Sequence, residues 1–346
     1  MKIFSGFVFL RRGARAIVAG AALLAAAAAS AQHDLYVCAA FNNGSRVMGS
    51  RDGSSNGVFL RTESGFKHIG INYPLTISTT FDPRDPNVFY VASLSGVLRT
   101  LDGGKSWRLV TGWDETEPKS IAVDFKNPDH VYTGLPDGIV VSRDRGFTWA
   151  RAEKGLPARG KYTQVVRADR TAAGRVLIGC ETGIYATTDG AKSWRQLFAT
   201  KETVNDIQQS PHDPKLWMAV TQSAGVLISR DGGAKWSPVA GLPTEKAWYN
   251  VAFDARDPQR LALASWTYGL HVSEDGGKTW TSRVAGLPEP TRVWRTAIDP
   301  DSGALYAAVF GQGLHLSSDF GRTWRVVPGM EGASVQTFTF VPRNRR

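Results

Sequence analysis

Short runs of alternating apolar and polar residues fill most of the chain, and each run ends at Gly, Asp or Pro. The stretch that begins at residue 249 shows the pattern clearly, because YNVAFDARDP, RLALAS, GLHVSEDGG and KTWTSRV follow one another with a turn between them. Alternation with a period of two, together with β-branched and aromatic residues, is typical of short strands. No segment after residue 31 has a sustained helical period. The pattern therefore predicts an all-β chain.

One octet recurs along the chain with the form [ST]-x-D-x-G-x-[ST]-W. It reads TLDGGKSW at 100–107, SEDGGKTW at 273–280 and SSDFGRTW at 317–324, and varied copies lie at 142–149, 187–194 and 229–236. Its tryptophans are 42 to 45 residues apart: Trp107, Trp149, Trp194, Trp236, Trp280 and Trp324. A period of about 40–45 residues predicts four short strands per unit, as in a propeller blade.

The number of units predicts a closed ring of seven blades. First-strand segments begin near Leu75, Ser120, Tyr162, Val204, Tyr249, Val293 and Ser334, and second strands follow at 34–40, 88–93, 130–135, 175–180, 215–220, 260–265 and 304–309. The chain after residue 31 thus opens on a second strand and ends on a surplus first strand, SVQTFTFVP. We expect that last strand to complete blade one beside residues 34–69, which removes exposed sheet edges.

The repeated octet looks like a catalytic turn, but its recurrence in each blade predicts a structural role. An Asp in such a turn can accept hydrogen bonds from its own backbone, Gly adopts backbone shapes that other residues resist, and Trp can wedge between sheets. Blade one keeps only the degenerate TESGF at 62–66. The predicted structural acids are Asp102, Asp144, Asp189, Asp231, Asp275 and Asp319.

Residues 1–31 have the pattern of an export signal, which leaves 32–346 for the propeller. A basic region precedes the small apolar stretch Ala16–Ala29, and Ala29-Ser30-Ala31 fits a cleavage site before Gln32. The apolar stretch is shorter than the roughly 20 residues of a membrane-spanning helix. We therefore expect a periplasmic or secreted protein without stable membrane insertion. The pair of arginines at 11 and 12 is compatible with twin-arginine export, and the general secretion pathway is the alternative.

The charge of the chain argues against a nucleic acid partner, and its two cysteines are too far apart to form a disulfide. The whole chain carries a net charge of +10, and removal of residues 1–31 takes away four basic residues, so 10 − 4 = +6 remains. Apart from the C-terminal Arg343-Asn344-Arg345-Arg346 there is no basic run, so we expect no nucleic acid partner. Cys38 and Cys180 fall at equivalent second-strand positions of blades one and four, almost opposite in the ring. We expect both to be buried free thiols.

The octets resemble those of the BNR/Asp-box repeat superfamily, over essentially all of 32–346. Members of that superfamily include sialidases, xyloglucanases, sortilin-type receptor domains and photosystem II assembly factors. A resemblance to sialidases would imply six blades and an early F-R-I-P motif. This chain has seven units, and the nearest match to the motif is Phe59-Leu60-Arg61-Thr62. Xyloglucanases of this type pair two seven-bladed rings, and sortilin-type domains are larger and carry Cys-rich modules. A single ring is most similar to the assembly factors, which implies a binding scaffold for other proteins.

In propellers the loops that enter first strands share one face with those that join second to third strands. On that face we expect a partner surface formed by Trp113, Tyr162, Trp248, Tyr249, Trp266, Tyr268, Arg292, Trp294, Arg295 and Phe310. Aligned first strands place four polar residues at the channel mouth: Gln164, Asp206, Asn250 and Arg295. Aromatic rings beside convergent polar groups suit a ligand site. The loop at 41–57 is rich in Gly, Ser and Asn, which fits a flexible lid and a disordered surface loop equally well.

Two functions follow, and the first is favoured. It is a non-enzymatic scaffold for an envelope or secreted protein or peptide, and the alternative is a carbohydrate-binding protein or glycoside hydrolase. Hydrolysis needs two facing carboxyls, and the sequence does not show which candidates converge. No motif for a metal or a nucleotide occurs, so we expect no cofactor. The candidate acids are Asp114, Glu115, Glu117, Glu181, Asp206, Glu245 and Glu289.

Overall fold

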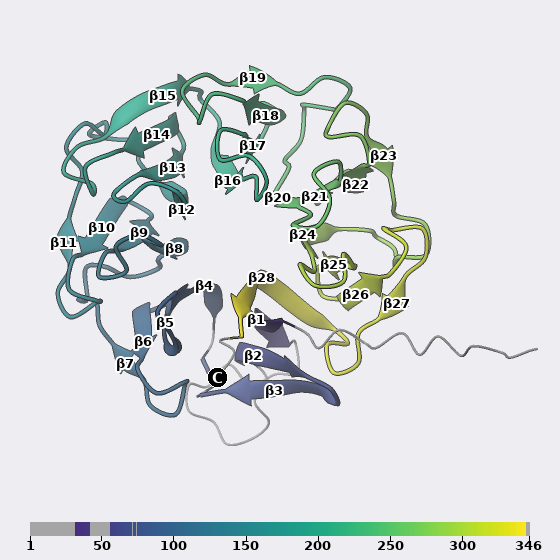
Figure 1. The fold of residues 1–346 in the computed structure, drawn as a ribbon, viewed down its shortest axis with the longest axis horizontal. Coiled ribbons are helices and arrows are strands. Elements are labelled where there is room, and N and C mark those ends of the chain that lie inside the picture. Colours follow the sequence, from purple (N-terminus) through teal and green to yellow (C-terminus); the bar gives the residue numbers. More distant parts are fainter. Residues whose placement is uncertain (1–31, 42–55, 71, 74, 344–346) are drawn as a thin grey trace, which may run out of the picture. The chain divides into compact units, whose positions relative to one another are not determined.

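The computed structural model describes residues 32–41, 56–70, 72–73 and 75–343, and Gln32–Arg346 form a compact unit distinct from Met1–Ala31. Every regular element in this described part is a β-strand, and the strands form seven four-stranded sheets around a central channel (Figure 1). The predicted seven-bladed all-β propeller is confirmed. The predicted signal peptide, 1–31, and most of the loop 41–57 lie outside the described residues.

Each blade takes its strands in chain order, except the first. Blade one contains β1 (His33–Phe41), β2 (Asn56–Thr62), β3 (Gly65–Ile69) and β28 (Ala333–Pro342). Blade two contains β4 (Thr76–Asp82), β5 (Asp85–Ser93), β6 (Gly96–Thr100) and β7 (Arg108–Leu109), and blade three β8 (Ser120–Val123), β9 (Val131–Leu135), β10 (Gly138–Ser142) and β11 (Ala150–Arg151). Blade four contains β12 (Thr163–Ala168), β13 (Val176–Cys180), β14 (Gly183–Thr187) and β15 (Arg195–Ala199).

The other three blades repeat this arrangement. Blade five contains β16 (Val204–Gln209), β17 (Trp217–Thr221), β18 (Val226–Ser229) and β19 (Ser237–Pro238). Blade six contains β20 (Asn250–Phe253), β21 (Leu261–Ser265), β22 (Gly269–Ser273) and β23 (Thr281–Ser282), and blade seven β24 (Val293–Ile298), β25 (Leu305–Val309), β26 (Gly313–Ser317) and β27 (Arg325–Val326). Five of the seven outer strands are only two residues long, which is shorter than the pattern predicted: β7, β11, β19, β23 and β27.

The C-terminal strand closes the ring, as predicted. β28 pairs antiparallel with β1 from His33↔Pro342 to Phe41↔Ala333, so blade one has the order β28-β1-β2-β3. Figure 1 shows β28 at the channel, beside the innermost strands of blades two and seven. Blade one is therefore built from both ends of the propeller chain.

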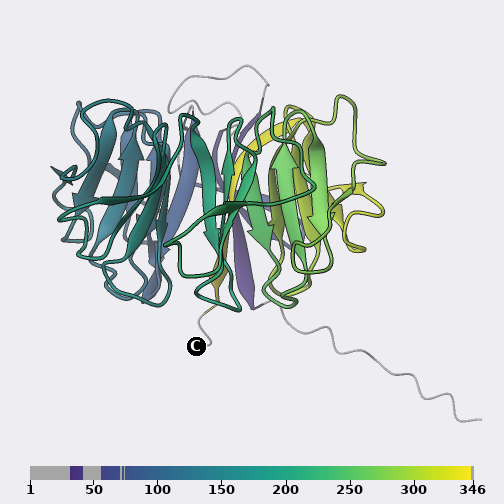
Figure 2. The same ribbon diagram turned by 90° about the horizontal axis from the view of Figure 1, so that it is seen from above.

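The strands run between two opposite faces of the ring (Figure 2). We call the face with the second-to-third connections and the blade-to-blade connections the loop face. The opposite face, which carries the tight first-to-second and third-to-fourth turns, is the turn face. The octets lie on the turn face, because each connects a third strand to a fourth strand.

The acids of the octets hold their own turns. Asp275 accepts hydrogen bonds through Oδ1 from the backbone N–H of Thr279 (2.9 Å) and through Oδ2 from the Thr279 hydroxyl (2.6 Å). The Ser273 hydroxyl also donates to Oδ1 at 2.8 Å and accepts the N–H of Gly277. The same arrangement surrounds Asp102, Asp144, Asp189 and Asp319. In blade five Lys235 replaces the hydroxyl residue, so Asp231 lacks the side-chain hydroxyl donor at that position and keeps the Ser229 hydroxyl and the Lys235 N–H.

Two of the octet tryptophans connect neighbouring blades directly. Trp194 donates its indole N–H to the carbonyl of Ala152 at 2.7 Å, and Trp324 donates to the carbonyl of Arg283 at 3.1 Å. In both cases the acceptor belongs to the preceding blade. Because each ring also packs in an interblade apolar cluster, the tryptophan fastens one sheet to the next.

Seven apolar clusters form the core, one at each interface between blades. Cys38 packs in the cluster between blades one and two, and Cys180 in the cluster between blades three and four. Both thiols are buried and unpaired, as predicted. Burial raises the pKa of Cys38 to about 12 and that of Cys180 to about 11, so both are unreactive thiols at neutral pH.

Candidate functional site: an aromatic cluster at the channel mouth

Four aromatic side chains of blades six and seven form one cluster on the loop face. Tyr249 precedes β20, Trp266 lies in the β21–β22 connection, Trp294 lies in β24 and Phe310 lies in the β25–β26 connection. The ring centroids of Tyr249 and Trp294 are 4.6 Å apart, and those of Trp266 and Phe310 are 4.7 Å apart. Trp266 meets Trp294 edge-on at 6.1 Å and joins the two pairs. We call these four residues the aromatic cluster.

Two guanidinium groups lie over the aromatic cluster. Arg292 is exposed and lies 5.2 Å from the centroid of Trp266, and Arg295 lies 4.6 Å from that of Trp294. Arg295 is fixed by donating to the carbonyls of Gln336, Tyr249 and Trp294. Burial lowers the pKa of Arg295 to about 10, so the side chain stays a cation at neutral pH. The site thus combines a stacking surface with positive charge.

The structure corrects the predicted partner surface at Trp248. This side chain has 0% exposure and donates its indole N–H to the carbonyl of Pro243, so it belongs to the core between blades five and six. Tyr268 packs on Trp248 and donates its hydroxyl to Glu245. A ligand on the loop face therefore cannot reach Trp248.

Two further predicted residues lie apart from the aromatic cluster. Trp113, in the connection from blade two to blade three, is 91% exposed. Its loop is fixed because Gly112 donates its N–H to Glu115, and Arg151 donates to the carbonyl of Asp114. Tyr162 precedes β12 of blade four, where the Lys119 ammonium lies 5.7 Å from its ring. The predicted partner surface therefore consists of the aromatic cluster of blades six and seven and two aromatic residues on other blades, where the sequence had placed them.

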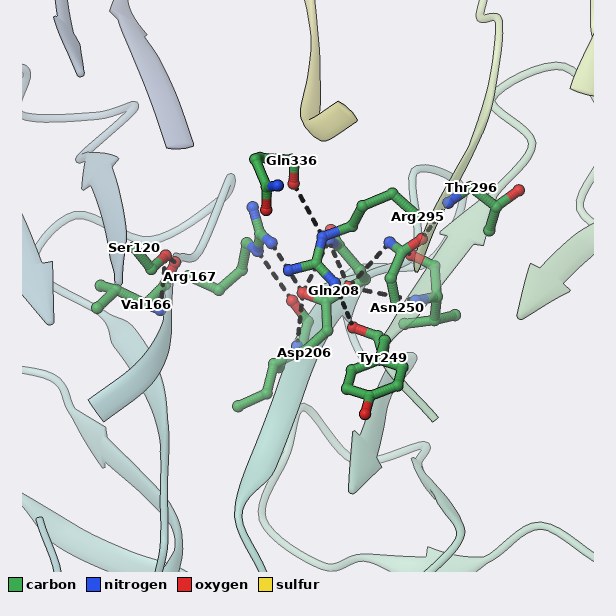
Figure 3. A network of polar contacts seen from close by, with 12 residues as sticks. Ser120, Val166, Arg167, Asp206, Gln208, Tyr249, Asn250, Arg295, Thr296 and Gln336 are labelled. Carbon is green, nitrogen blue, oxygen red and sulfur yellow. Dashed lines mark hydrogen bonds and ion pairs between the residues drawn. The ribbon is translucent and has the colours of Figure 1, made fainter. Parts of the chain in front are cut away.

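Three of the four predicted channel-mouth residues, Asp206, Asn250 and Arg295, belong to a polar network between inner strands (Figure 3). Asp206 is buried and accepts hydrogen bonds from Arg167 (3.1 Å), Asn250 (3.2 Å) and the backbone N–H of Val251 (3.2 Å). Asn250 in turn accepts the backbone N–H of Thr296 at 2.6 Å. Asp206 and Asn250 thereby join blades four to seven, which is a structural role.

The network is part of a hydrogen-bonded belt that crosses all seven interfaces. Each bond joins the innermost strands of adjacent blades. The members are Thr79 to Thr339, Val123 to Thr80, Val166 to Ser120, Arg167 to Ile207, Val251 to Asp206, Thr296 to Asn250 and Arg295 to Gln336. The belt fixes the inner strands that carry the channel mouth.

β-Bulges near the loop face decide which side chains reach the mouth. The register of the inner strands skips one residue at Ile77, Gln164, Asn205, Trp294 and Gln336. A bulge re-aims a side chain, and here it brings the Trp294 indole N–H to the side-chain oxygen of Gln336 at 3.1 Å. The predicted alignment is therefore off by one residue at Gln164, which matches Asn205 and Trp294 rather than Asp206 and Arg295.

Sequence reasoning missed Arg167 and Gln336, which complete the network at the mouth. Both lie on inner strands, Arg167 in β12 and Gln336 in β28. The available signal was the polar character of Gln336 within the apolar SVQTFTFVP strand. Arg167 had no such signal, because its role depends on Asp206 of the next blade.

The central channel contains two cavities. One of about 400 Å³ is lined mostly by blades four to seven, and its lining residues include Gln164, Arg167, Asp206, Asn250 and Arg295. The other, about 540 Å³, lies toward the turn face and is lined by Phe81, Phe125, Phe338 and Phe340 among others. Gln164 therefore does share the polar cavity with the other three predicted mouth residues.

Most candidate acids engage local partners. Glu115 accepts the N–H of Gly112, Glu117 pairs with Lys119 at 3.1 Å, and Glu289 accepts the N–H of Thr291. Within the described residues no three His, Cys, Asp or Glu side chains gather as a metal site would require. A search of the same residues for a helix long and apolar enough to cross a membrane finds none.

Residues 71–222 match the family model described as Photosynthesis system II assembly factor YCF48, over less than half of the chain. A probable oligoxyloglucan-reducing end-specific xyloglucanase of Neosartorya fischeri is 29% identical over 168 residues, which cover 43% of this chain and 20% of the relative. The Emericella nidulans enzyme is 27% identical over 147 residues, covering 40% and 18%. The chain thus spans about a fifth of the length of these curated relatives.

Solved structures share the propeller. The GH74 xyloglucanase of Xanthomonas campestris aligns with a TM-score of 0.64 at 18% identity, over 78% of this chain and 50% of that chain. YCF48 bound to D1 peptide aligns with a TM-score of 0.59 at 18% identity, over 78% of this chain and 93% of that chain. The partial family match, the octets and the seven closed blades are consistent with the BNR-repeat β-propeller superfamily, and the solved structures show the shared propeller fold.

Proposed function

We propose that this propeller is an exported scaffold that binds a segment of a partner protein on its loop face. The observation that carries the proposal is the aromatic cluster, with Arg292 and Arg295 over its rings. Aromatic and arginine side chains are the favoured anchors of protein interfaces. Phe310 is 42% exposed, so the cluster offers apolar area to a partner.

The polar cavity beside the cluster supports a peptide as the ligand. Gln164 and Gln336 lie at bulges of the channel mouth and provide amide groups for hydrogen bonding, while Tyr249 borders both cavity and cluster. An extended chain can place side chains on the rings and its backbone over the amides. YCF48, a propeller with the same fold, has been solved with a D1 peptide.

Carbohydrate binding is the second candidate. The faces of tryptophan rings suit sugar rings, and the curated relatives are xyloglucanases. Glycoside hydrolysis would need two carboxyls about 5–10 Å apart across the bond. Asp206, the acid that lines the polar cavity, is engaged by Arg167 and Asn250, so it supports the scaffold role better than a catalytic one.

Binding by surface variants tests the proposal. Peptides of about 12 residues would be selected from a displayed random library on the purified protein, and xyloglucan oligosaccharides would be tested in parallel. We expect selected peptides to bind the native protein and the Trp266→Ala/Phe310→Ala variant to bind them at least about tenfold more weakly. Phe147→Ala is the matched control, because Phe147 is 63% exposed but lies in an octet of the turn face.

Two results would contradict the proposal. One is peptide affinity that falls equally in Trp266→Ala/Phe310→Ala and in Phe147→Ala. The other is binding or cleavage of xyloglucan oligosaccharides without any selected peptide, which would establish the carbohydrate function instead.

A further inference from the structure

The first described residues meet a single carboxylate of blade seven. Asp301, in the β24–β25 turn, accepts the backbone N–H groups of Gln32 (2.7 Å) and His33 (2.9 Å) through Oδ2. Its Oδ1 lies 2.7 Å from Nδ1 of His33. One carboxylate thus receives three contacts from two consecutive residues, across an interface between blades.

Gln32 is also held from its other side. The backbone N–H of Arg343 donates to the Gln32 carbonyl at 2.7 Å, directly after β28 ends. The Arg343 guanidinium donates to Asp34 at 2.7 Å. Gln32 therefore lies between the turn of blade seven and the end of the closing strand, at the place where the ring closes.

Asp301 is ionised at neutral pH. Burial raises the pKa of its carboxyl, but the hydrogen bonds from His33 and Gln32 outweigh burial and hold the pKa below its usual value. The side chain keeps 21% exposure, so it is only partly screened by water. A cation placed at the position of the Gln32 nitrogen would meet this negative charge at hydrogen-bond distance.

The predicted export signal ends at this nitrogen. Hydrolysis of the Ala31–Gln32 bond by a processing endopeptidase consumes water, leaves a carboxylate on Ala31 and frees the amino group of Gln32. An α-amino group has a pKa of about 7.7–8.0 in model peptides, and a neighbouring carboxylate favours the protonated form. We propose that Asp301 is the binding site for the α-ammonium group of Gln32 in the processed chain, where it forms an ion pair at the ring closure.

The proposed ion pair has a chemical consequence for Gln32. An N-terminal glutamine cyclises when the lone pair of its neutral amine attacks its own side-chain carbonyl carbon, and ammonia leaves as the lactam forms. A protonated amine has no lone pair to attack with. Binding to Asp301 therefore protects Gln32 from cyclisation, which a mass spectrum detects as the loss of ammonia.

The test compares two forms of the full propeller, one beginning at Gln32 and one that retains Ala31 before it. Asp301→Asn is introduced into both forms. We expect the substitution to lower Tm by about 2 °C more in the Gln32 form than in the Ala31 form, and to speed loss of ammonia from the Gln32 form several-fold. The matched control is Asp213→Asn, which removes the same charge from the corresponding turn of blade five and is expected to affect both forms equally.

Equal Tm losses in both forms, with an unchanged rate of ammonia loss, would overturn the proposal and leave Asp301 as an acceptor for backbone N–H groups only. Amino-terminal sequencing of the exported protein adds a second check. If the exported protein began at a residue other than Gln32, the proposed ion pair with Asp301 would also be overturned. Neither result bears on peptide binding at the loop face, so the two proposals fail separately.

Discussion

Asp206 shows how a buried charge is used at the residue scale. Its carboxylate receives Arg167 from blade four and both Asn250 and Val251 from blade six. Removing a buried acceptor leaves its donors without partners, and that cost exceeds the net value of the bonds. The residue that sequence placed among ligand candidates is thus required for the packing of three blades.

We expect Asp206→Ala to lower the free energy of unfolding by about 2–4 kcal/mol, because the guanidinium of Arg167 and the amide of Asn250 lose their acceptor. Urea denaturation followed by tryptophan fluorescence measures this. Asp114→Ala, in an exposed loop, is the control and is expected to change stability by less than about 0.5 kcal/mol. Similar small losses in both variants would show that Asp206 is free for a ligand.

Residue identity alone could not decide which aromatic side chains meet at the surface. Trp248 and Tyr249 are adjacent and both aromatic, yet Trp248 is in the core and Tyr249 is at the channel mouth. Of the two side chains, that of Trp248 packs into the interface between blades five and six, and that of Tyr249 does not. The bulge at Trp294 adds a local register change that no alternating pattern reveals. The sequence could therefore predict the face but not the aromatic cluster.

At the scale of the element, the octet turn is a self-contained hydrogen-bonded unit whose recurrence made the blades predictable. Its acid is ionised in the fold, since hydrogen bonds from Ser106 lower the pKa of Asp102 to about 2. Hydrogen bonds from Thr187 and Ser193 lower the pKa of Asp189 to about 2, and those of Asp275 and Asp319 are lower still. Because the octet recurs, several blades each contain a carboxyl group with a lowered pKa.

These lowered pKa values predict acid sensitivity. A carboxyl whose pKa is lower in the folded than in the unfolded state stabilises the fold above its unfolded value of about 3.9, and that contribution is lost as pH falls through the folded value. We expect the free energy of unfolding to fall between about pH 5 and pH 2, and to fall less steeply in Asp275→Asn. Urea denaturation at several pH values measures both slopes, and identical slopes would contradict the prediction.

Blade five allows the octet turn to be tested by adding a hydrogen bond, whereas Asp275→Asn removes a carboxylate. In five octets a Ser or Thr hydroxyl donates to Oδ2 of the acid at 2.6–2.7 Å, whereas Lys235 takes that position in blade five. We expect Lys235→Thr to restore the bond and raise Tm by about 1–2 °C. Ala234→Thr, one residue earlier, is the control without a gain. An unchanged Tm in Lys235→Thr would show that the hydroxyl adds nothing to the turn.

At the scale of the whole molecule, ring closure is the feature that sequence predicted best. The surplus strand at the C-terminus and the missing first strand at the start require each other, and β28 pairs with β1 as that count demands. The outer strands were predicted less well. β7, β11, β19, β23 and β27 have two residues each, because the chain leaves the sheet soon after the octet tryptophan.

Deletion of residues 333–346 should open the ring. It removes the partner of β1 and uncovers Leu35 and Val37 in the cluster between blades one and seven. We expect a Tm more than about 10 °C lower and a broader transition, because a long apolar strand leaves the core. A synthetic peptide of the same residues, added in trans, should restore part of the loss. A Tm within 1 °C of the native value would contradict closure by this strand.

Hydrogen–deuterium exchange of the full propeller, with and without a peptide selected on it, tests the central claim most directly. If the loop face of blades six and seven is the partner surface, the peptide slows exchange in the β21–β22 and β25–β26 connections around Trp266 and Phe310. The octets of the turn face then exchange as before. Protection confined to the octets or to the outer strands would contradict the account.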